Sequence, residues 1–329
     1  MNIANFLTNL ENRQTILFVC VRAVPMHFPR DLRAYGIESH WLNTAPMTRR
    51  LLFVYAHPDD ESFGNAGTIA YYAHHGVSVH YICATRGEAG DVDPSLLQGY
   101  GDIATLRSTE LGDAANAMGL AAYHFLNYRD SGMPNTPANE HPEALVQAPV
   151  EAVAAKVTAA IRAIQPQVVI TFNEYGGYGH PDHIAMHHAT HLAFARAGDG
   201  AWLPEQLDAG LPTWTPRKLY YSTFNPLLIK MMLRLWRLSG RDPRKGGNNG
   251  DIDFVKILEA VNPPTASVDC SSVVDQKVAA WQAHRSQLGQ MGLSLKLPRL
   301  LRQRFLGREQ FSRVVPQPNG YERDLFEGI

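Results

Sequence analysis

The sequence is poor in several features that mark other classes of protein. Only three cysteines occur among its 329 residues (Cys20, Cys83 and Cys270), and they are widely separated with no CxxC pair. This spacing argues against a disulfide framework and favours reduced, buried thiols. The formal net charge is only −1, so nothing in the composition indicates a nucleic-acid partner.

Long apolar runs and a secretory signal are also missing. No apolar stretch approaches the ~20 residues of a membrane span. The N-terminus lacks a basic segment followed by an apolar core and a small-residue cleavage site. These absences predict a soluble, cytoplasmic protein with no transmembrane segment, and they leave its oligomeric state open.

The chain does contain enough apolar sequence, 45% of its residues, for one good-sized α/β core or two modest ones. Residues 1–46 differ from the rest, because a polar start and a short apolar piece at 16–21 precede prolines and scattered charges. We predict an N-terminal extension at 1–46, a catalytic core at 47–222 and a C-terminal part of the same domain at 223–329. Alternatively, the piece at 16–21 adds a strand to the sheet or packs over it.

Apolar runs alternate with helical patterns from residue 50 onward. Strands are expected at 51–56, 77–84, 122–126 and 167–172, and helices at 62–75, 104–118, 150–164 and 182–197. Strands separated by helices indicate a parallel sheet covered on both faces. The predicted fold is therefore α/β and Rossmann-like, with a doubly wound, mostly parallel sheet and a C-terminal lid or extension.

The segment 56–62, Ala-His-Pro-Asp-Asp-Glu-Ser, directly follows the first apolar run. It places a histidine and two carboxylates at the mouth of a buried strand, where an open α/β sheet usually binds its ligand. His57 and Asp60 can face one metal ion, while Asp59 points differently and stays free as a base. Taken alone, these residues would fit a helix cap equally well.

A second motif, Tyr-Gly-His-Pro-Asp-His at 178–183, follows another apolar run and the pair Gly176-Gly177. Its His183 supplies a third ligand from the first turn of the next helix. Three protein ligands and one open position suit a hydrolytic zinc ion, which lowers the pKa of a bound water to about 7. We predict one divalent metal per chain, Zn²⁺ by default, although Fe²⁺ also suits two histidines and a carboxylate.

Together the two motifs resemble the PIG-L/LmbE family of zinc-dependent N-deacetylases, which hydrolyse N-acetylglucosamine-type amides. The likeness covers about residues 50–195 and includes the segments 85–90, 106–111, 128–133 and 176–180. It is greatest for the bacterial branch that contains mycothiol-pathway deacetylases and conjugate amidases. The resemblance implies zinc bound by His57, Asp60 and His183, with Asp59 as the general base.

The resemblance also implies roles for five further residues. His180 would stabilise the oxyanion or protonate the leaving amine, and Tyr178 would contribute to oxyanion stabilisation. Arg107 and Asp130 would bind the sugar hydroxyls, and Glu88 would line the same pocket. A zinc-activated water, a carboxylate and a second histidine are a sufficient minimum for amide hydrolysis.

Other interpretations of these residues remain open. Without the family likeness, Arg107 and Glu110 would be interpreted as an exposed i,i+3 pair. His187, His188 and His191 are expected to be surface residues or to lie behind the ligands, although His187 is a conceivable i,i+4 metal ligand.

The preferred function is hydrolysis of the N-acetyl amide of a glucosamine-containing small molecule or glycoconjugate, with a small-molecule amino sugar as substrate. One alternative is an amidase that cleaves a mycothiol-like thiol conjugate. In that branch a lysine tends to follow the first motif, whereas 63–65 here are Phe-Gly-Asn, which favours the deacetylase. The other alternative is a non-catalytic sugar- or nucleotide-binding module, against which the intact Asp59 argues.

Two basic, apolar segments lie in the C-terminal part. The segment 225–238 predicts a helix that packs on its own domain, covers the active site as a lid or rests on a membrane interface. The run 296–313 carries apolar residues at roughly helical spacing and is expected to pack against the domain or to bind an acidic partner.

Overall fold

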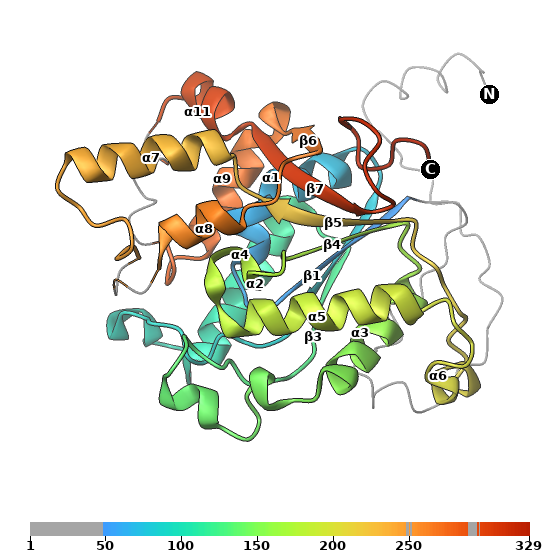
Figure 1. Cartoon of the computed structure of the whole chain (residues 1–329). Helices are drawn as coiled ribbons and strands as arrows, with labels where there is room; N and C mark the ends of the chain where they lie inside the picture. Colours follow the sequence, from blue (N-terminus) through green and yellow to red (C-terminus); the bar gives the residue numbers. More distant parts are fainter. Residues whose placement is uncertain (1–48, 248–249, 251, 289–294, 296) are drawn as a thin grey trace, which may run out of the picture.

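The computed structural model describes residues 49–247, 250, 252–288, 295 and 297–329, which form one sheet with helices on both faces (Figure 1). The strand order is β3-β2-β1-β4-β5-β7-β6. The predicted extension at 1–46, its piece at 16–21 and Cys20 lie outside the described residues.

Five strands of the sheet are parallel and two are not. The parallel strands are β1 (Arg50–Tyr55), β2 (Ser78–Cys83), β3 (Ala122–Phe125), β4 (Val168–Thr171) and β5 (Lys218–Thr223). Strand β7 (Arg308–Val315) runs antiparallel to β5, and β6 (Ala266–Asp269) runs antiparallel to β7. The prediction of a mostly parallel α/β sheet is confirmed, and each of the four predicted strands is placed within two residues.

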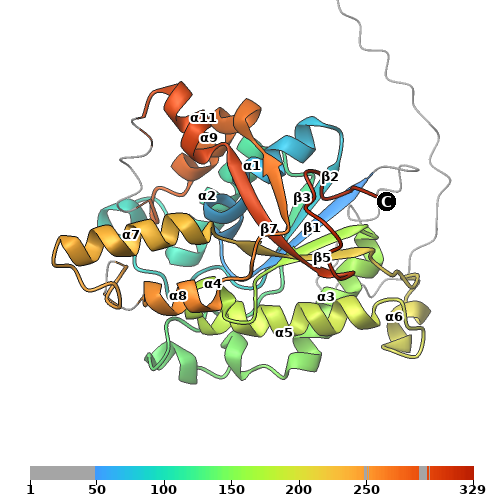
Figure 2. The ribbon, with the colours of Figure 1, turned by 45° about the horizontal axis from the view of Figure 1, so that its top comes forward.

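Helices cover both faces of this sheet, as Figures 1 and 2 show. Helices α3 (Val150–Ile164) and α5 (Pro181–Arg196) pack together against β1 on one face. Helices α1 (Asp60–His74), α2 (Ile103–Met118) and α9 (Val274–Ala283) form the layer on the other. Residues 51–55 of β1 are almost wholly buried, as expected for a central parallel strand covered on both sides.

Local sequence fixes several helix ends. The Asp102 side chain accepts a hydrogen bond from the backbone N–H of Thr105 (2.7 Å) at the start of α2. Gly119 ends the same helix at φ 75°, a conformation that costs a glycine little. Shorter helices are α4 (Gly176–Gly179), α6 (Pro204–Asp208) and α8 (Phe254–Ala260).

The C-terminal part adds helices α7 (Pro226–Leu238) and α11 (Arg299–Leu306). The expected helical packing of the run 296–313 was wrong in two respects. The chain leaves the helix after Leu306, because 308–315 finds backbone partners in β5 and β6 as strand β7. Phe311 in this strand is buried, but Leu300 and Phe305 of α11 are 79% and 64% exposed.

No helix among the described residues is long and apolar enough to cross a membrane.

The order of the strands determines where a ligand can bind. Strand β1 lies between β2 and β4, so the chain winds in one direction through β2 and β3 and in the other through β4 and β5. In such sheets the crevice lies at the carboxyl ends of the strands where the direction reverses. The first motif follows β1 and the second follows β4, so both lie at this crevice.

Candidate active site

The turn after β1 is held in an unusual conformation. Asp59 has φ 115°, a region that a non-glycine residue enters only when its surroundings compensate for the steric cost. Asp60 Oδ2 accepts hydrogen bonds from the backbone N–H groups of His57 (2.8 Å) and Ala56 (3.2 Å). This carboxylate therefore closes the turn and is itself fixed at the end of β1.

The turn after β4 brings the second motif to the same crevice. Gly176 has φ 65°, and a Cβ at this position would lie 2.7 Å from the Cβ of His183. Glycine therefore allows the chain to pass close to the first turn of α5. His180 caps that helix, because its Nδ1 accepts a hydrogen bond from the backbone N–H of Asp182 (3.2 Å).

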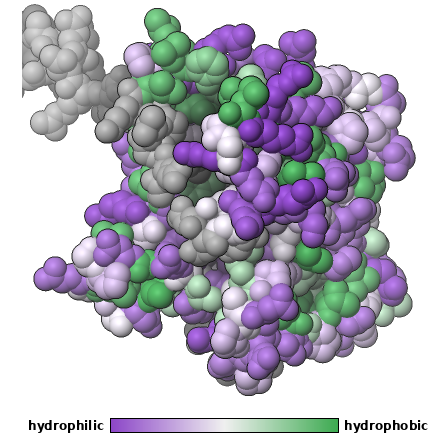
Figure 3. Space-filling model, turned by 60° about the vertical axis from the view of Figure 1, so that its left-hand side comes forward, coloured by the Kyte–Doolittle hydropathy of each residue, from purple (hydrophilic) through white to green (hydrophobic). Residues whose placement is uncertain are grey.

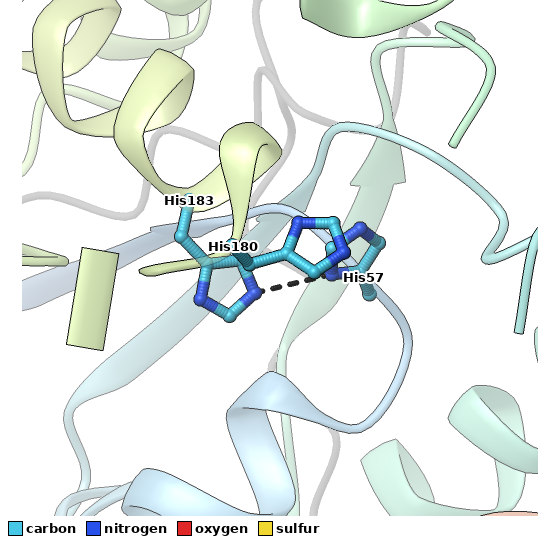
Figure 4. Close-up of side chains that lie close together, drawn as sticks. All are labelled: His57, His180 and His183. Atoms are coloured by element: carbon cyan, nitrogen blue, oxygen red, sulfur yellow. Dashed lines mark hydrogen bonds between the residues drawn. The ribbon is translucent and has the colours of Figure 1, made fainter. Parts of the chain in front are cut away.

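The three predicted metal ligands converge at this point. His57 Nδ1 lies 3.1 Å from His183 Nε2, as the dashed line in Figure 4 marks, and 3.6 Å from Asp60 Oδ2. His183 Nε2 lies 3.3 Å from Asp60 Oδ1. Bonds of about 2.0–2.1 Å in a tetrahedral zinc site place ligand atoms about 3.3–3.4 Å apart. The observed separations fit such a site.

The partners behind the two histidines fix their tautomers. His57 Nε2 faces Asp182 Oδ2 (3.1 Å) and His183 Nδ1 faces the Gly176 carbonyl oxygen (3.0 Å). Since carboxylate and carbonyl oxygens only accept, both of these ring nitrogens carry hydrogen. In the neutral rings, the facing nitrogens of His57 and His183 then both present lone pairs. Such a pair is favourable when a cation lies between them.

A neighbouring histidine also lies near this point, and His57, His180 and His183 form one possible metal-binding group. The Nδ1 lone pair of His180 is occupied by the backbone N–H that it caps. Burial, reinforced by the other two histidines, holds the pKa of His180 well below its usual range. A neutral His180 therefore carries hydrogen on Nε2 and is a donor, which favours Asp60 over His180 as the predicted third ligand.

The cluster as a whole attracts positive charge. Burial opposes charging of His57, but Asp130, Asp182 and Asp60 outweigh this effect and raise its pKa well above the usual range. The second possible metal-binding group, His57 with Asp130 and Asp182, shares the same imidazole. Because that group faces the hydrogen-bearing Nε2, we interpret its carboxylates as the support that orients His57 toward the ion.

Asp59 lies beside the ligands and is paired with a cation. Its Oδ2 lies 3.0 Å from the Nη2 of Arg107. Burial raises the pKa of Asp59 to about 6, with a smaller contribution from Asp60, and Arg107 acts in the opposite direction. A carboxylate with a pKa near the working pH can take up and release a proton, which is the requirement for a general base.

Arg107 is buried rather than an exposed surface residue. Its guanidinium also donates to the carbonyl oxygens of Pro58 (2.5 Å) and Gly87 (3.1 Å). Glu110, also buried, accepts instead from the backbone N–H (2.9 Å) and hydroxyl (2.6 Å) of Ser286. The interpretation of Arg107 and Glu110 as an exposed pair was therefore wrong, because a segment distant in sequence covers them.

The other residues of the predicted sugar pocket lie close by. Asp130 Oδ1 lies 3.4 Å from His57 Nε2 and accepts from the backbone N–H of Gly132 (2.8 Å). Glu88 accepts from the backbone N–H of Asp130 (3.0 Å). Both carboxylates thus contact protein groups of the site, and their predicted contacts with sugar hydroxyls stay a prediction.

Tyr178 extends over the histidines from α4. Its ring centroid lies 4.9 Å from that of His183 and 6.0 Å from that of His180. Burial raises the pKa of Tyr178, so its hydroxyl stays protonated and can donate. His187 lies one turn further along α5, and its Nδ1 contacts the carbonyl oxygen of Phe172 (3.1 Å). This contact turns His187 away from the ligand cluster.

Three residues without a predicted role support the site. Asp182 is fully buried behind His57, and Glu61 forms a buried pair with His284. Asp182 and Glu61 belong to the two sequence motifs, so the sequence already indicated that they lie near the site. His284 lies more than two hundred residues from Glu61, directly after helix α9, and no local pattern marks it.

Comparison with known proteins agrees with this geometry. Residues 52–194 match the family model PIG-L, described as GlcNAc-PI de-N-acetylase. The chain is 36% identical to the 1D-myo-inositol 2-acetamido-2-deoxy-alpha-D-glucopyranoside deacetylase of Acidothermus cellulolyticus, over 86% of this chain and 96% of that protein. It is also 36% identical to the enzyme of the same name from Thermobifida fusca, over 84% and 99%.

Solved structures with a similar fold catalyse different reactions. The N,N'-diacetylchitobiose deacetylase of Pyrococcus horikoshii is 22% identical, with a TM-score of 0.55 over 81% of this chain and 84% of that one. The 4-carboxy-2-hydroxymuconate hydratase of Pseudomonas putida is 20% identical, with a TM-score of 0.54 over 82% and 98%. The fold alone therefore does not select the reaction. The sequence relatives, however, confirm the predicted resemblance: the chain belongs to the PIG-L, or GlcNAc-PI de-N-acetylase, family.

Proposed function

We propose that the protein is a zinc-dependent N-deacetylase that removes the acetyl group from an N-acetylglucosamine unit linked to a small polyol such as myo-inositol. The observation that carries the proposal is the pair of facing histidine nitrogens with Asp60 beside them and the separate carboxylate of Asp59 next to the cluster. A binding module needs neither a third ligand nor a base. The names of the sequence relatives support the substrate class.

His57, Asp60 and His183 would hold the ion. When bound, a divalent cation supplies Lewis acidity, which acidifies a water molecule and polarises the amide carbonyl. Asp59, with its raised pKa, accepts the proton of the attacking water. Arg107 keeps the base in position through its contacts with Asp59 and the Pro58 carbonyl.

Two donors face the amide from the other turn. His180 presents its Nε2 hydrogen, and Tyr178 presents a hydroxyl that remains protonated. Both can donate to the oxygen that becomes negative when water adds to the carbonyl. The amine then leaves with the proton that Asp59 took up or with one from His180, so acetate and a free amino sugar are the products.

The direct test is release of acetate and of a primary amine by the purified, zinc-loaded protein. N-acetylglucosaminyl-inositol is the first substrate, with free N-acetylglucosamine and an N-acetylglucosamine thiol conjugate as comparisons. Stoichiometric acetate and amine from the inositol compound support the proposal. Cleavage of only the conjugate amide would instead identify the amidase, and binding without turnover by protein of full zinc content would identify a non-catalytic module.

The metal is tested separately by elemental analysis of protein purified with chelators excluded, followed by reconstitution of the metal-free protein. We expect about one ion per chain and restoration by Zn²⁺. Higher activity with Fe²⁺ under anaerobic conditions would identify iron as the native metal.

A further inference from the structure

Helix α7 carries apolar side chains on two opposite faces. Ile229 and Leu233 are buried against α8 and the tyrosines of the α4 region. The outer face is defined by five residues that recur every three or four positions or lie beside that row. They are Leu227, Leu228, Met231, Leu235 and Leu238, and they are 71%, 53%, 56%, 58% and 80% exposed.

Cations border this outer face along one flank. Lys230, Arg234 and Arg237 are exposed, α7 contains no acidic residue, and none of these three cations forms an ion pair with any residue that the structure describes. A groove of about 600 Å³ between α7 and α8 is lined by both kinds of side chain, with Glu259 as its acidic member. Within the part of the chain that the structure describes, this surface therefore combines exposed apolar side chains with three cations that have no ion pair.

Helix α11 repeats this composition. Leu300, Leu301 and Phe305 are 79%, 43% and 64% exposed, and the same eight residues include three arginines and no acid. Asp275 of α9 pairs with two of these arginines, Arg299 (2.9 Å) and Arg302 (3.5 Å), whereas Arg304 has no ion pair with a described residue. Figures 1 and 2 place α7 and α11 on the same side of the molecule. Figure 3 brings that side forward and shows hydrophobic side chains gathered next to strongly hydrophilic ones. Two helices far apart in sequence thus both expose apolar side chains next to basic ones.

We propose that the outer face of α7, together with α11, docks the protein on an anionic membrane surface. Helices that lie in the membrane interface combine an apolar face with flanking Lys and Arg, and anionic lipid headgroups attract those cations. A membrane surface is wide enough to contact both helices at once, and it offers anionic headgroups beside an apolar interior. The cations of α7, which have no ion pair with a described residue, favour this occupant.

The docking surface lies close to the active site. Helix α8 lies between α7 and α4, and the cluster of Ile229, Leu233 and Ile257 packs directly against Tyr178. A protein bound through α7 would hold its catalytic crevice near the lipid headgroups. The proposal does not depend on the deacetylase activity, because it rests on α7 and α11 alone.

Flotation with lipid vesicles tests the proposal. We expect the full-length protein to float with vesicles of equal parts phosphatidylglycerol and phosphatidylcholine and to remain behind with phosphatidylcholine alone. Replacing the three cations (Lys230→Gln, Arg234→Gln and Arg237→Gln together) should weaken binding roughly a hundredfold, because each contributes about a fivefold factor near an anionic surface at low salt. Met231→Ser with Leu235→Ser should weaken it at least as much.

Matched controls separate docking from a loss of folding. Tyr321→Ser and Arg217→Gln change an exposed ring and an exposed cation outside both helices, and these variants should float like the wild type. Equal binding of wild type and α7 variants, binding to neutral vesicles alone, or no binding would each overturn the proposal. So would a dimer in solution that Leu235→Ser dissociates, because the outer face would then bind a second copy of the chain.

A second inference concerns the buried pair Glu61 and His284. Glu61 Oε2 accepts a hydrogen bond from the backbone N–H of Asp59 (2.9 Å), and Oε1 accepts from the Ser62 hydroxyl (2.6 Å) and His284 Nε2 (2.7 Å). Both partners of the pair are fully buried. Trp281 adds a hydrogen bond from its indole to the Ser62 carbonyl oxygen (2.8 Å).

We infer that His284 is a positioning residue for Asp59 and acts through Glu61. The φ of 115° at Asp59 is costly for a non-glycine residue and persists only where neighbours fix it. Glu61 holds the N–H of that residue, and His284 holds Glu61. The inference rests on the proposed role of Asp59 as general base. It assigns a function to a C-terminal residue outside the matched segment 52–194.

Kinetics of His284→Ala and His284→Gln test this inference. Displacement of a reacting group by about 1 Å costs about 10²-fold in rate, so His284→Ala should lower kcat on that scale with KM and bound zinc unchanged. The Gln side chain can present an N–H near the position of Nε2 and should recover part of kcat. An unchanged kcat, or losses of zinc and of kcat in equal proportion, would overturn the inference. An inactive wild type would instead refute the proposed function.

Discussion

The turn at 57–62 and the outer face of α7 are unusual in opposite ways: the turn buries charged side chains, and the helix exposes apolar ones. In the turn, His57 and Glu61 are buried and Asp59 and Asp60 are largely so, and these side chains are paired within the chain, from the Asp60 carboxylate to the Glu61–His284 pair. On α7, five large apolar side chains are each more than half exposed. Buried charge is tolerated only when it is paired, and exposed apolar area usually marks a contact. Each exception therefore points to a function.

The largest expected effect comes from removing a proposed metal ligand. His183→Ala deletes one of the two facing nitrogens, so the remaining ligands cannot complete a tetrahedral site. We expect bound zinc to fall far below one ion per chain and acetate release to disappear. Elemental analysis after dialysis measures the first effect. His188→Ala, an exposed histidine of the same helix, is the control, and full zinc content in His183→Ala would contradict the ligand set.

Asp59→Asn should distinguish the proposed base from the proposed ligands. The substitution keeps the shape of the side chain and its contact with Arg107 but removes its basicity. We expect kcat to fall by about 10²–10⁴-fold with zinc content nearly unchanged. Equal losses of zinc and activity would identify Asp59 as a ligand and would require a new role for Asp60.

Two leucines of α7 test the difference between its faces. Leu233 is 4% exposed and Leu235 is 58% exposed on the same helix. We expect Leu233→Ala to lower the free energy of unfolding by about 2–5 kcal/mol, and Leu235→Ala to change it by no more than about 0.5 kcal/mol. Urea unfolding of both variants measures the difference. A large destabilisation by Leu235→Ala would show that its side chain is covered in solution.

Asp182→Asn should lower the affinity of the site for zinc, because Asp182 supports the ring of His57. The carboxylate fixes the orientation and tautomer of His57 from the side away from the proposed ion. Loss of such a supporting partner typically lowers metal affinity by about 10–100-fold. Competition with a zinc chelator measures the affinity, and Asp199→Asn, an exposed aspartate, is the control. Unchanged affinity would mean that Asp130 alone orients the imidazole.

The stability of the metal-free protein should depend on pH, because burial makes ionisation of Asp59 unfavourable in the folded state. In the metal-free protein the pKa of Asp59 is raised to about 6, whereas an unfolded aspartate titrates near about 3.9. The stability that Asp59 contributes is therefore fully present below about pH 4 and is lost as the pH rises through about 6. Relative to the wild type, Asp59→Asn should gain stability over this interval and no further above it. Thermal unfolding of the chelated proteins at several pH values measures this, and a constant difference between them would contradict the raised pKa.

The sequence by itself determined the sheet and the residues that converge in the candidate site. Continuous apolar runs at 51–55 and 168–171 specify strands buried on both faces, and the strand ends carry the motifs that hold His57, Asp60 and His183. These features are local in sequence: a strand is recognised by its own residues, and a ligand pair three residues apart shares one turn. The family likeness and the mostly parallel fold were predictable for this reason.

Only the tertiary structure decided which residues support the site and which apolar residues are covered. Glu110 and Ser286 lie on segments that meet only after folding, so burial of the Arg107 neighbourhood could not be inferred from helical spacing. Residues 308–315 form a strand because they pair with the edge of β5. Their own sequence does not show that this edge is available. Burial and pairing depend on contacts between distant segments. Local pattern specifies an element and its chemistry, whereas the packing of elements determines the neighbours of each side chain.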